Sequence, residues 1–306
     1  MHGKRVLVTG ATGQVGLPVA KALAAGNEVF AAARFRDASA RAELEAAGAR
    51  CVTADLAAGD LDQVPTDLDY VVHLAVMKSN HWDRDLTGNA EGVGLLMAHC
   101  RGAKAFLHCS STGVYQPDGH RSFAEDDPLG DNHRVLSFMS TYSICKIAAE
   151  AVVRTASRLY DLPTTVARLN VPYGDNGGWP AFHLEMMLAG MAVAVGTDGP
   201  SLYNPIHEDD IVAQIPALLG AASVPATIVN WGGVDVVSIE DWCAWLGELT
   251  GLDAVIEPSA DALPSVTVDL TRQHGLVGPT SVGWRDGMRR MVAARHPELL
   301  DGGGGG

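Results

Sequence analysis

Short apolar runs alternate with longer segments of helical repeat through the first half of this 306-residue chain. The apolar runs predict strands, and the segments with apolar residues three and four positions apart predict amphipathic helices. Gly26, Gly48 and Gly102 stand where helices are expected to stop. The predicted strands are Arg5–Thr9, Glu28–Ala33, Arg50–Thr53, Asp69–Leu74, Ala105–Cys109 and Val166–Leu169. The predicted helices are Val15–Ala25, Ser39–Ala47, Leu86–Arg101 and Tyr142–Tyr160.

Strands this apolar, each followed by a helix, predict a parallel sheet that is covered on both faces. The fold class is therefore α/β, a doubly wound sheet of the Rossmann type with a smaller C-terminal α/β lobe that binds substrate. We expect a dinucleotide-binding domain over residues 1–170, a lobe over 171–301 that shares part of its core with it, and a disordered glycine tail over 302–306. Further predicted elements are Pro180–Ala189, Asp209–Leu219, Ile239–Thr250, Gly283–Arg295 and the strand Thr227–Trp231.

The charge balance excludes two broad classes of partner. The chain has 36 acidic and 22 basic side chains, a formal net charge of −14. Proteins that bind nucleic acid or anionic membranes need basic stripes, so neither partner is expected. The five cysteines are dispersed and contain no C-x-x-C pair, which predicts reduced thiols in the cytoplasm rather than disulfides or a metal site. We expect neither a signal peptide nor a membrane span.

A glycine-rich segment, Val8-Thr9-Gly10-Ala11-Thr12-Gly13-Gln14-Val15-Gly16, follows the first predicted strand and opens the first predicted helix. A phosphate group can approach a helix N-terminus closely only where side chains are absent, and there it meets free N–H groups and the positive end of the helix dipole. We expect Gly10 to let the chain turn, Gly13 to admit the pyrophosphate, and Gly16 to let helix and strand pack closely. The predicted cofactor contacts in this segment are Gly10, Thr12, Gly13, Gln14 and Val15.

The spacing G-x-x-G-x-x-G resembles that of the short-chain dehydrogenase/reductase superfamily. Asp55-Leu56 after the third strand resembles the family's acidic contact to the adenine amino group, although an isolated Asp can equally cap a helix. His73-Leu74-Ala75 resembles the H-L-A-A segment that lies beside the adenosine and ribose. The resemblance implies cofactor contacts at Asp55, Leu56, Leu74 and Ala75.

The end of the second strand favours NADP over NAD. An NAD enzyme usually has an acid there that binds the ribose 2′-hydroxyl. That position falls near Ala33, and Arg34 and Arg36 follow it. A guanidinium can hold a 2′-phosphate through two charge-assisted hydrogen bonds, so we predict that both arginines contact NADP. The alternative is that they are solvated loop charges.

The candidate for proton transfer is the segment Tyr142-Ser143-Ile144-Cys145-Lys146. Positions four apart share one helix face, so the Lys146 ammonium can lie near the Tyr142 hydroxyl. A free phenol has a pKa of about 10, and we expect the neighbouring cation to lower it. Tyr142 could then exchange a proton with a carbonyl or alcohol oxygen while a nicotinamide cofactor exchanges a hydride. Both residues are also expected to contact the cofactor.

Further segments resemble the extended branch of this family. Phe106 to Tyr115 is similar to its S-S-x-x-V-Y-G strand, which selects Ser111 as the catalytic hydroxyl, with Ser110 and Thr112 as alternatives. Asn89 matches the helical Asn of N-V-x-G-T, which is usually a structural residue. Arg168 to Gly174 resembles R-x-x-N-V-Y-G, which implies that the backbone of Asn170, Val171 and Pro172 meets the nicotinamide. Asn204 to Ile211 resembles the F-I-H-V-D-D-V segment, and the whole resemblance covers about residues 4–235.

Departures from the family pattern bear on the substrate. Thr112-Gly113 stand where family dehydratases have an acid pair, which disfavours sugar dehydration. The Asn that contacts substrate in nucleotide-sugar enzymes is replaced in register by Val171, and Gln116 replaces the glycine of V-Y-G. Lys78, Thr112, Trp179 and His183 are the predicted substrate contacts. His81 and Trp82 are expected on a surface loop, and His207 with Asp209 and Asp210 is expected to start a helix rather than bind metal.

These observations predict an enzyme, an NADP-dependent oxidoreductase of the extended short-chain dehydrogenase/reductase type that interconverts a carbonyl and an alcohol on a small molecule. The alternatives are a nucleotide-sugar epimerase with transient hydride transfer and a non-catalytic NADP sensor. Sensor relatives typically lack the tyrosine–lysine pair, which this chain retains. The resemblance also implies a homodimer built through Leu86–Arg101 and Tyr142–Tyr160.

Overall fold

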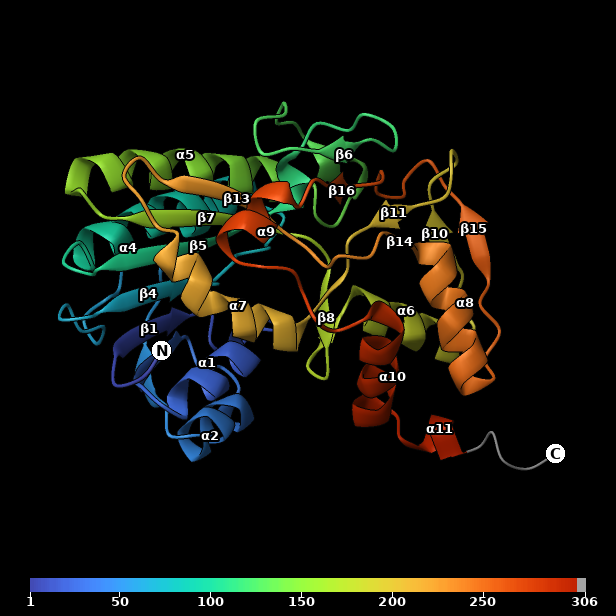
Figure 1. Ribbon diagram of the computed structural model, residues 1–306, viewed down its shortest axis with the longest axis horizontal. Helices are drawn as coiled ribbons and strands as arrows, with labels where there is room; N and C mark the ends of the chain where they lie inside the picture. The colour runs from blue at the N-terminus through green and yellow to red at the C-terminus, as the bar shows by residue number, and fades with distance from the viewer. Residues whose placement is uncertain (302–306) are drawn as a thin grey trace.

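Seven parallel strands form the central sheet of the computed structural model, which describes residues 1–301 (Figure 1). The order of the strands is β3 (Arg50–Thr53), β2 (Glu28–Ala33), β1 (Arg5–Thr9), β4 (Tyr70–His73), β5 (Ala105–Ser111), β7 (Thr164–Leu169) and β13 (Thr227–Trp231). The chain moves outwards in one direction to β3 and then returns to build the other half from β4. This reversal between β1 and β4 is the point at which doubly wound sheets bind ligands. The predicted α/β fold is confirmed.

Two apolar layers bury the sheet, because successive residues of each strand point to opposite faces. Val6 and Val8 face the layer covered by α1 (Gly16–Ala24), α2 (Ala38–Ala46) and α7 (Glu208–Gly220). Leu7 faces the layer covered by α4 (Gly92–His99) and α5 (Tyr142–Tyr160). Strand β13 and helix α7 come from the second half of the chain, so that half completes the sheet that the first half begins.

The helix predicted over Leu86–Arg101 is broken into three parts, which corrects the sequence expectation. Helix α3 (Trp82–Leu86) leads into a π-helical segment at Thr87–Glu91, and α4 follows it. The Asn89 side chain lies in the wider turn, where it accepts a hydrogen bond from Met77 N–H (2.8 Å) and donates to the Met77 carbonyl (2.9 Å). The spacing of apolar residues cannot predict a π-helical segment that depends on hydrogen bonds between a side chain and the backbone of another loop.

A smaller lobe, built mostly from the second half of the chain, forms around α6 (Trp179–Leu188), α8 (Ile239–Thr250) and α10 (Trp284–Arg295), on the right of Figure 1. Trp242 and Tyr203 lie in its core. Its strands are two or three residues long, too short for a recognisable alternation. They are β6 (Ser122–Phe123), β8 (Pro172–Gly174), β9 (Gly177–Gly178), β10 (Val193–Val195), β11 (Leu202–Tyr203), β12 (Ile206–His207), β14 (Val237–Ser238), β15 (Ile256–Pro258) and β16 (Thr267–Val268). Two short helices, α9 (Thr271–Leu276) and α11 (Glu298–Asp301), complete it. The glycine tail predicted over 302–306 lies outside the described residues.

Candidate active site

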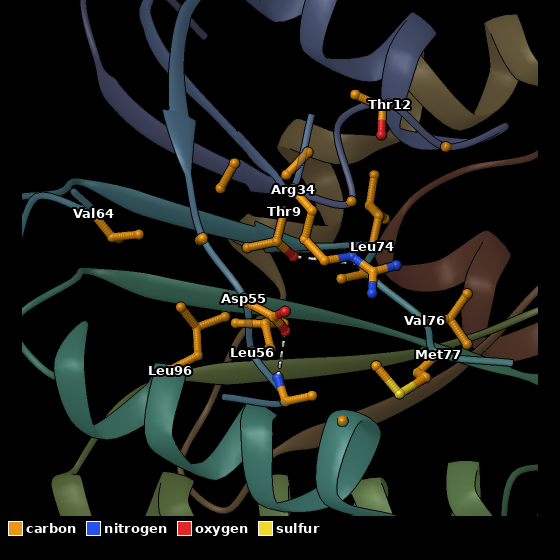
Figure 2. Close-up of a pocket in the computed structure, with 18 of the residues that line it drawn as sticks. Thr9, Thr12, Arg34, Asp55, Leu56, Val64, Leu74, Val76, Met77 and Leu96 are labelled. Carbon is orange, nitrogen blue, oxygen red and sulfur yellow. Dashed lines mark hydrogen bonds between the residues drawn. The ribbon is translucent and has the colours of Figure 1, made fainter. Parts of the chain in front are cut away.

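A cavity of about 210 Å³ opens at the carboxyl ends of β1 to β4, beside the reversal of the chain (Figure 2). The lining residues lie at the end of each of the four strands or in the segment that follows it. Many of the predicted cofactor contacts line this cavity, namely Gly10, Thr12, Gly13, Arg34, Asp55, Leu56, Leu74 and Ala75. The structure thus brings together residues that are spread along the sequence from Gly10 to Ala75. They lie where a dinucleotide binds in this class of fold.

The glycine turn is dictated by backbone contacts. Gly10 has a φ of +66°, and a Cβ there would come within 2.7 Å of Ala75 Cα, two residues after the end of the neighbouring β4 strand. A Cβ on Gly16 would overlap the carbonyl oxygen of Gly10. Side chains at these two positions would therefore close the turn that the first helix starts from, as expected from the sequence. Gln14 lies beside the turn and donates a hydrogen bond to the Pro172 carbonyl (2.9 Å).

Arg34 and Asp55 lie at the ends of β2 and β3. Figure 2 shows the Arg34 side chain extended over the cavity, and it is exposed. Asp55 accepts a hydrogen bond from Ala57 N–H (3.1 Å), so it caps the following turn while it also lines the cavity. Asp55 thus caps a turn where a helix cap was the alternative, and its contact to the adenine amino group stays a prediction. Arg36 is exposed and does not line the cavity.

Ser111, Tyr142 and Lys146 come together outside the cavity lining, and the segment after β4 connects them to it, because Met77 lines the cavity and Lys78 Nζ lies 5.6 Å from the centre of the Tyr142 ring. Ser111 ends β5, Tyr142 is the first residue of α5, and Lys146 lies one helical turn later. The Ser111 side chain lies where hydrogen bonding to the Tyr142 phenol lowers the pKa of that phenol, and the Ser111 Oγ also accepts from Gly113 N–H (3.1 Å). The Lys146 ammonium lies 5.9 Å from the centre of the Tyr142 ring and donates to the Cys109 carbonyl (2.8 Å). The predicted face of α5 therefore carries both residues.

The expected effect of Lys146 on Tyr142 is wrong. Burial raises the pKa of Tyr142 above its usual value, and this outweighs the opposing effects of Lys78 and of the Ser111 hydrogen bond. Burial also lowers the pKa of Lys146, whose ammonium is held by the Cys109 carbonyl. Lys78 is the cation that acts most on the phenol, since its Nζ lies 5.6 Å from the ring centre. The tyrosine is therefore protonated at neutral pH, which suits a proton donor.

His133 was not recognised from the sequence, yet its ring lies 4.6 Å from the Tyr142 ring, centre to centre. A Cβ on Gly113 would come within 2.5 Å of His133 Cε1, so the histidine fills the space that a side chain at 113 would need. Ser143 donates its hydroxyl hydrogen to the Gly113 carbonyl (2.6 Å), so its Oγ accepts from His133 Nδ1 (3.0 Å). Burial lowers the pKa of His133 to about 4. The ring is therefore neutral and leaves Nε2 with the lone pair.

Buried polar side chains fix the start of the catalytic helix. Asp85 accepts hydrogen bonds from Thr141 Oγ1 (2.7 Å), from Ser79 Oγ (2.6 Å) and from two backbone N–H groups. Burial would raise the pKa of Asp85, but these hydrogen bonds lower it below the usual value. Asp85 thus ties the residue before Tyr142 to the loop that carries Lys78, a contact between distant segments that the sequence pattern did not reveal.

A buried ion pair joins α5 to the strand beneath it. Arg168 on β7 contacts Glu150 on α5 at 2.8 Å, and each side chain is 2% exposed. Arg168 also donates to Tyr115 Oη (3.1 Å), and Glu150 accepts from Ser110 Oγ (2.6 Å). The arginine recognised in R-x-x-N is therefore a structural residue. Ser110, an alternative for the catalytic hydroxyl, is committed to Glu150.

Two predicted contacts lie inside the protein. Asn170 is fully buried, and its side-chain amide donates a hydrogen bond to the Val266 carbonyl (2.7 Å). Val171 and Pro172, the other two predicted contacts of this segment, are partly exposed. The prediction of His183 as a substrate contact is wrong, because its ring is buried in the core of the lobe and its Nδ1 accepts from Trp242 Nε1 (2.9 Å). Trp179 is half-buried at the edge of the same aromatic cluster. Thr112 is buried immediately after Ser111.

The segment His207-Glu208-Asp209-Asp210 starts a helix, as predicted. His207 caps α7 by accepting a hydrogen bond from Asp209 N–H at its Nδ1 (3.1 Å). Asp209 pairs with Arg290, and Asp210 accepts from Ser281 N–H (2.8 Å). Each acid therefore has a structural partner. His81 and Trp82 are exposed on the surface at the start of α3, as expected.

The buried histidines predict a loss of stability in mild acid. Burial lowers the pKa of His73 to about 3, and those of His133 and His183 to about 4. Above the unfolded value of about 6.5, both states are neutral and stability is complete. As pH falls from there, the unfolded chain takes up protons that the folded chain refuses, which costs up to roughly 3 kcal/mol per histidine by pH 4. Urea unfolding at pH 7 and pH 5 measures this, and an equal free energy of unfolding at both would contradict it.

Comparison with known proteins identifies the family. The model of the NAD dependent epimerase/dehydratase family matches residues 6–232. The chain belongs to this family. It is therefore an extended short-chain dehydrogenase/reductase enzyme, as the motifs indicated. A dTDP-glucose 4,6-dehydratase of Streptomyces griseus is 28% identical over 74% of the chain and 72% of its own length. The low-salt glycan biosynthesis protein Agl12 of Haloferax volcanii is 25% identical, over 76% of the chain and 77% of its own length.

Solved structures of family members share the fold. The UDP-glucuronic acid 4-epimerase of Bacillus cereus, in complex with UDP-glucuronic acid and NAD, superposes with a TM-score of 0.81 at 20% identity, covering 95% of this chain and 98% of its own. The UDP-N-acetylglucosamine 4-epimerase of Methanobrevibacter ruminantium gives a TM-score of 0.84 at 17% identity, covering 97% and 100%. At these identities the likeness establishes the fold alone. Within residues 1–301, none of the helices is long and apolar enough to cross a bilayer.

Proposed function

We propose that this family member is an NADP-dependent oxidoreductase that interconverts a carbonyl and an alcohol on a small molecule, with Tyr142 as the proton donor and acceptor. The observation that carries the proposal is the convergence of Tyr142, Ser111 and Lys146, which the segment Met77-Lys78 connects to the dinucleotide cavity. The cavity fits such a cofactor because its turn has no room for side chains at Gly10 and Gly16. When bound, the cofactor supplies or accepts the hydride.

The mechanism follows from the protonated state of Tyr142. In the reductive direction, its hydroxyl donates a proton to the carbonyl oxygen of the substrate, and Ser111 orients that oxygen through a hydrogen bond. The resulting phenolate is stabilised by the Lys78 ammonium, whose Nζ lies 5.6 Å from the ring centre, while Lys146 Nζ lies 5.9 Å from the same centre. In the oxidative direction, the phenolate takes the proton back from the alcohol. Proton transfer by a positioned side chain contributes about 10²–10⁴-fold to the rate.

The experiment that tests this function is a search for net cofactor turnover. Purified enzyme with NADPH and a panel of ketones and aldehydes should oxidise the cofactor, followed at 340 nm, with one alcohol formed per NADPH consumed. The second candidate, suggested by the nucleotide-sugar relatives, is an epimerase. An epimerase would instead invert a sugar centre in the presence of oxidised cofactor, with no net change in its redox state.

The preference for NADP has its own structural support. Strand β2 ends in Ala33 without a carboxylate, and Arg34 extends over the cavity. Asp37, the nearest acid downstream, is occupied in capping α2 through Ser39 N–H (2.8 Å). The B. cereus structure contains NAD, so a preference for NADP would set this chain apart from that relative. We infer that Arg34 holds the 2′-phosphate.

We predict that Arg34→Ala raises the KM for NADPH by at least about tenfold, since a charge-assisted hydrogen bond contributes about 1.5–3 kcal/mol. The KM for NADH should change little, and so should kcat with either cofactor. Arg36→Ala is the matched control, because Arg36 is exposed and lies outside the cavity lining. Equal efficiency with both cofactors in the wild-type enzyme, unchanged in Arg34→Ala, would refute the assignment.

We further propose that the enzyme forms a homodimer through α4 and α5. The two helices pack side by side on one face of the sheet (Figure 1), and a Cβ on Gly94 would come within 2.9 Å of Val152. Leu95 on α4 is 51% exposed and Leu159 on α5 is 73% exposed. A second copy would cover these apolar side chains.

A further inference from the structure

The stretch from Leu169 to Thr271 contains no lysine or arginine, although it has fourteen aspartates and glutamates. This stretch supplies most of the smaller lobe, including β8, α6, the strands β10 to β12 and α8. In the proposed function the sheet holds the cofactor, and the smaller lobe covers the remainder of the substrate. The charge of this stretch therefore bears directly on what the substrate can be.

The basic side chains that follow this stretch are engaged elsewhere. Arg272 on α9 contacts Glu125 and Asp126 at 3.5 and 3.2 Å. On α10, Arg290 pairs with Asp209, and Arg295 pairs with Glu185 at 3.3 Å. The remaining α10 arginines, Arg285 and Arg289, lie over the Trp245 ring, each 5.6 Å from its centre. Figure 1 shows α10 at the end of the lobe away from α5, the helix that carries Tyr142.

The helix N-termini of the lobe offer little to an anion. A helix start can bind phosphate through its free N–H groups and its dipole. The first turn of α8 already carries Glu240 and Asp241, and α7 begins with three acids. Helix α6 begins Trp179-Pro180, and proline removes one of the N–H donors of that turn. None of these starts resembles a phosphate site.

Lys78 is an exposed cation near the reacting centre. Lys146 is buried and donates to the Cys109 carbonyl, and Arg168 is paired with Glu150. Lys78 is exposed and lies 5.6 Å from the centre of the Tyr142 ring. The proposed mechanism uses it to stabilise the phenolate. It is placed at the reacting atoms, whereas the diphosphate of a nucleotide sugar lies away from the carbon that is oxidised.

We propose that the substrate is a phosphate-free carbonyl or alcohol compound, uncharged over the part that the smaller lobe covers. A nucleoside diphosphate brings two negative charges that proteins hold with arginine or lysine. The stretch from Leu169 to Thr271 has no lysine or arginine to compensate such a group, and its fourteen carboxylates would repel it. Its half-buried Trp179, which packs on Tyr203 with ring centres 5.0 Å apart, offers an apolar surface instead. This inference rests on the proposed function, and it separates the chain from the UDP-sugar epimerases that share its fold.

The test is calorimetric titration of the enzyme saturated with NADP, so that the dinucleotide cavity is filled and cannot bind the added nucleotide. The titrants are UDP, dTDP, UDP-glucose and UDP-glucuronic acid, at low and at physiological salt. A separate titration with NADPH, followed by its fluorescence, first establishes that the protein is folded and binds the cofactor. We expect no saturable binding of any titrant at concentrations up to about 1 mM. The affinity would then be at least about 100-fold weaker than two arginine–phosphate contacts would give.

The outcomes separate this inference from the proposed function. Saturable binding of UDP or dTDP to the loaded enzyme, weakened by salt, overturns the inference, whether or not any hydride transfer is found. Absence of nucleotide binding together with oxidation of NADPH by uncharged ketones or aldehydes supports both. Absence of nucleotide binding with no turnover of the carbonyl panel supports the charge argument and counts against the proposed reductase alone.

Discussion

Tyr142→Phe should lower kcat for carbonyl reduction by about 10²–10⁴-fold, the contribution of a positioned general acid. The substitution removes only the hydroxyl that donates the proton. The ring remains, with its contact to His133 at 4.6 Å, so the fold and cofactor binding should persist. The measurement is the single-turnover rate of NADPH oxidation with saturating substrate, combined with fluorescence titration of the cofactor.

Tyr160→Phe is the matched control for this substitution. Tyr160 is the last residue of the same helix and lies at the opposite end from the cavity. Its loss of a hydroxyl should leave kcat unchanged. A rate in Tyr142→Phe above about a tenth of the wild-type rate would be a smaller loss than the removal of a general acid causes. The proton would then have to come from another group, and His133 would be the first to examine.

Arg168→Met should destabilise the protein by about 3–5 kcal/mol, because it leaves the Glu150 carboxylate buried without its partner. Glu150 is 2% exposed and holds Ser110 on the strand that ends at Ser111. Urea unfolding at neutral pH measures the loss. Arg154→Met, an exposed arginine on α5, is the control and should change stability by no more than about 0.5 kcal/mol.

A double substitution separates the loss of the pair from the loss of packing. Arg168→Met combined with Glu150→Leu removes both charges and should recover part of the stability lost in Arg168→Met, since a buried ion pair can be replaced by apolar groups at small cost. A wild-type free energy of unfolding in Arg168→Met would show that this pair does not hold the catalytic helix against the sheet.

The sequence predicted the central sheet well because its signals are local. Buried parallel strands such as β1 and β2 have uninterrupted apolar runs, and their observed bounds equal the predicted ones. The helix Tyr142–Tyr160 also has its predicted bounds, since nineteen residues of amphipathic repeat leave little ambiguity. The helix predicted over Leu86–Arg101 is present but begins earlier, at Trp82, and it widens where the Asn89 side chain bonds to Met77. The short strands of the smaller lobe had too few residues to show a pattern.

The candidate site divides in the same way. Motif spacing was enough to propose Ser111, Tyr142 and Lys146 and most residues of the dinucleotide cavity. It could not reveal His133, which lies nine residues before Tyr142 and matches no motif. Only the folded structure shows that its ring contacts Tyr142 and fills the space that a side chain at Gly113 would need. Nor could spacing predict the protonation of Tyr142, which depends on how deeply the fold buries the phenol. Burial and contacts between distant segments are properties of the folded chain.

The most direct test of the account is a crystal structure of the enzyme with NADP, in which the distances from the nicotinamide C4 to Tyr142 Oη and to Ser111 Oγ are measured. The account predicts that both hydroxyls face C4 across a space that holds one carbonyl group, with each contact to its oxygen about 3 Å. A nicotinamide ring whose C4 faces away from these hydroxyls, or a space filled by protein side chains, would contradict the assignment of this chain as a hydride-transfer enzyme.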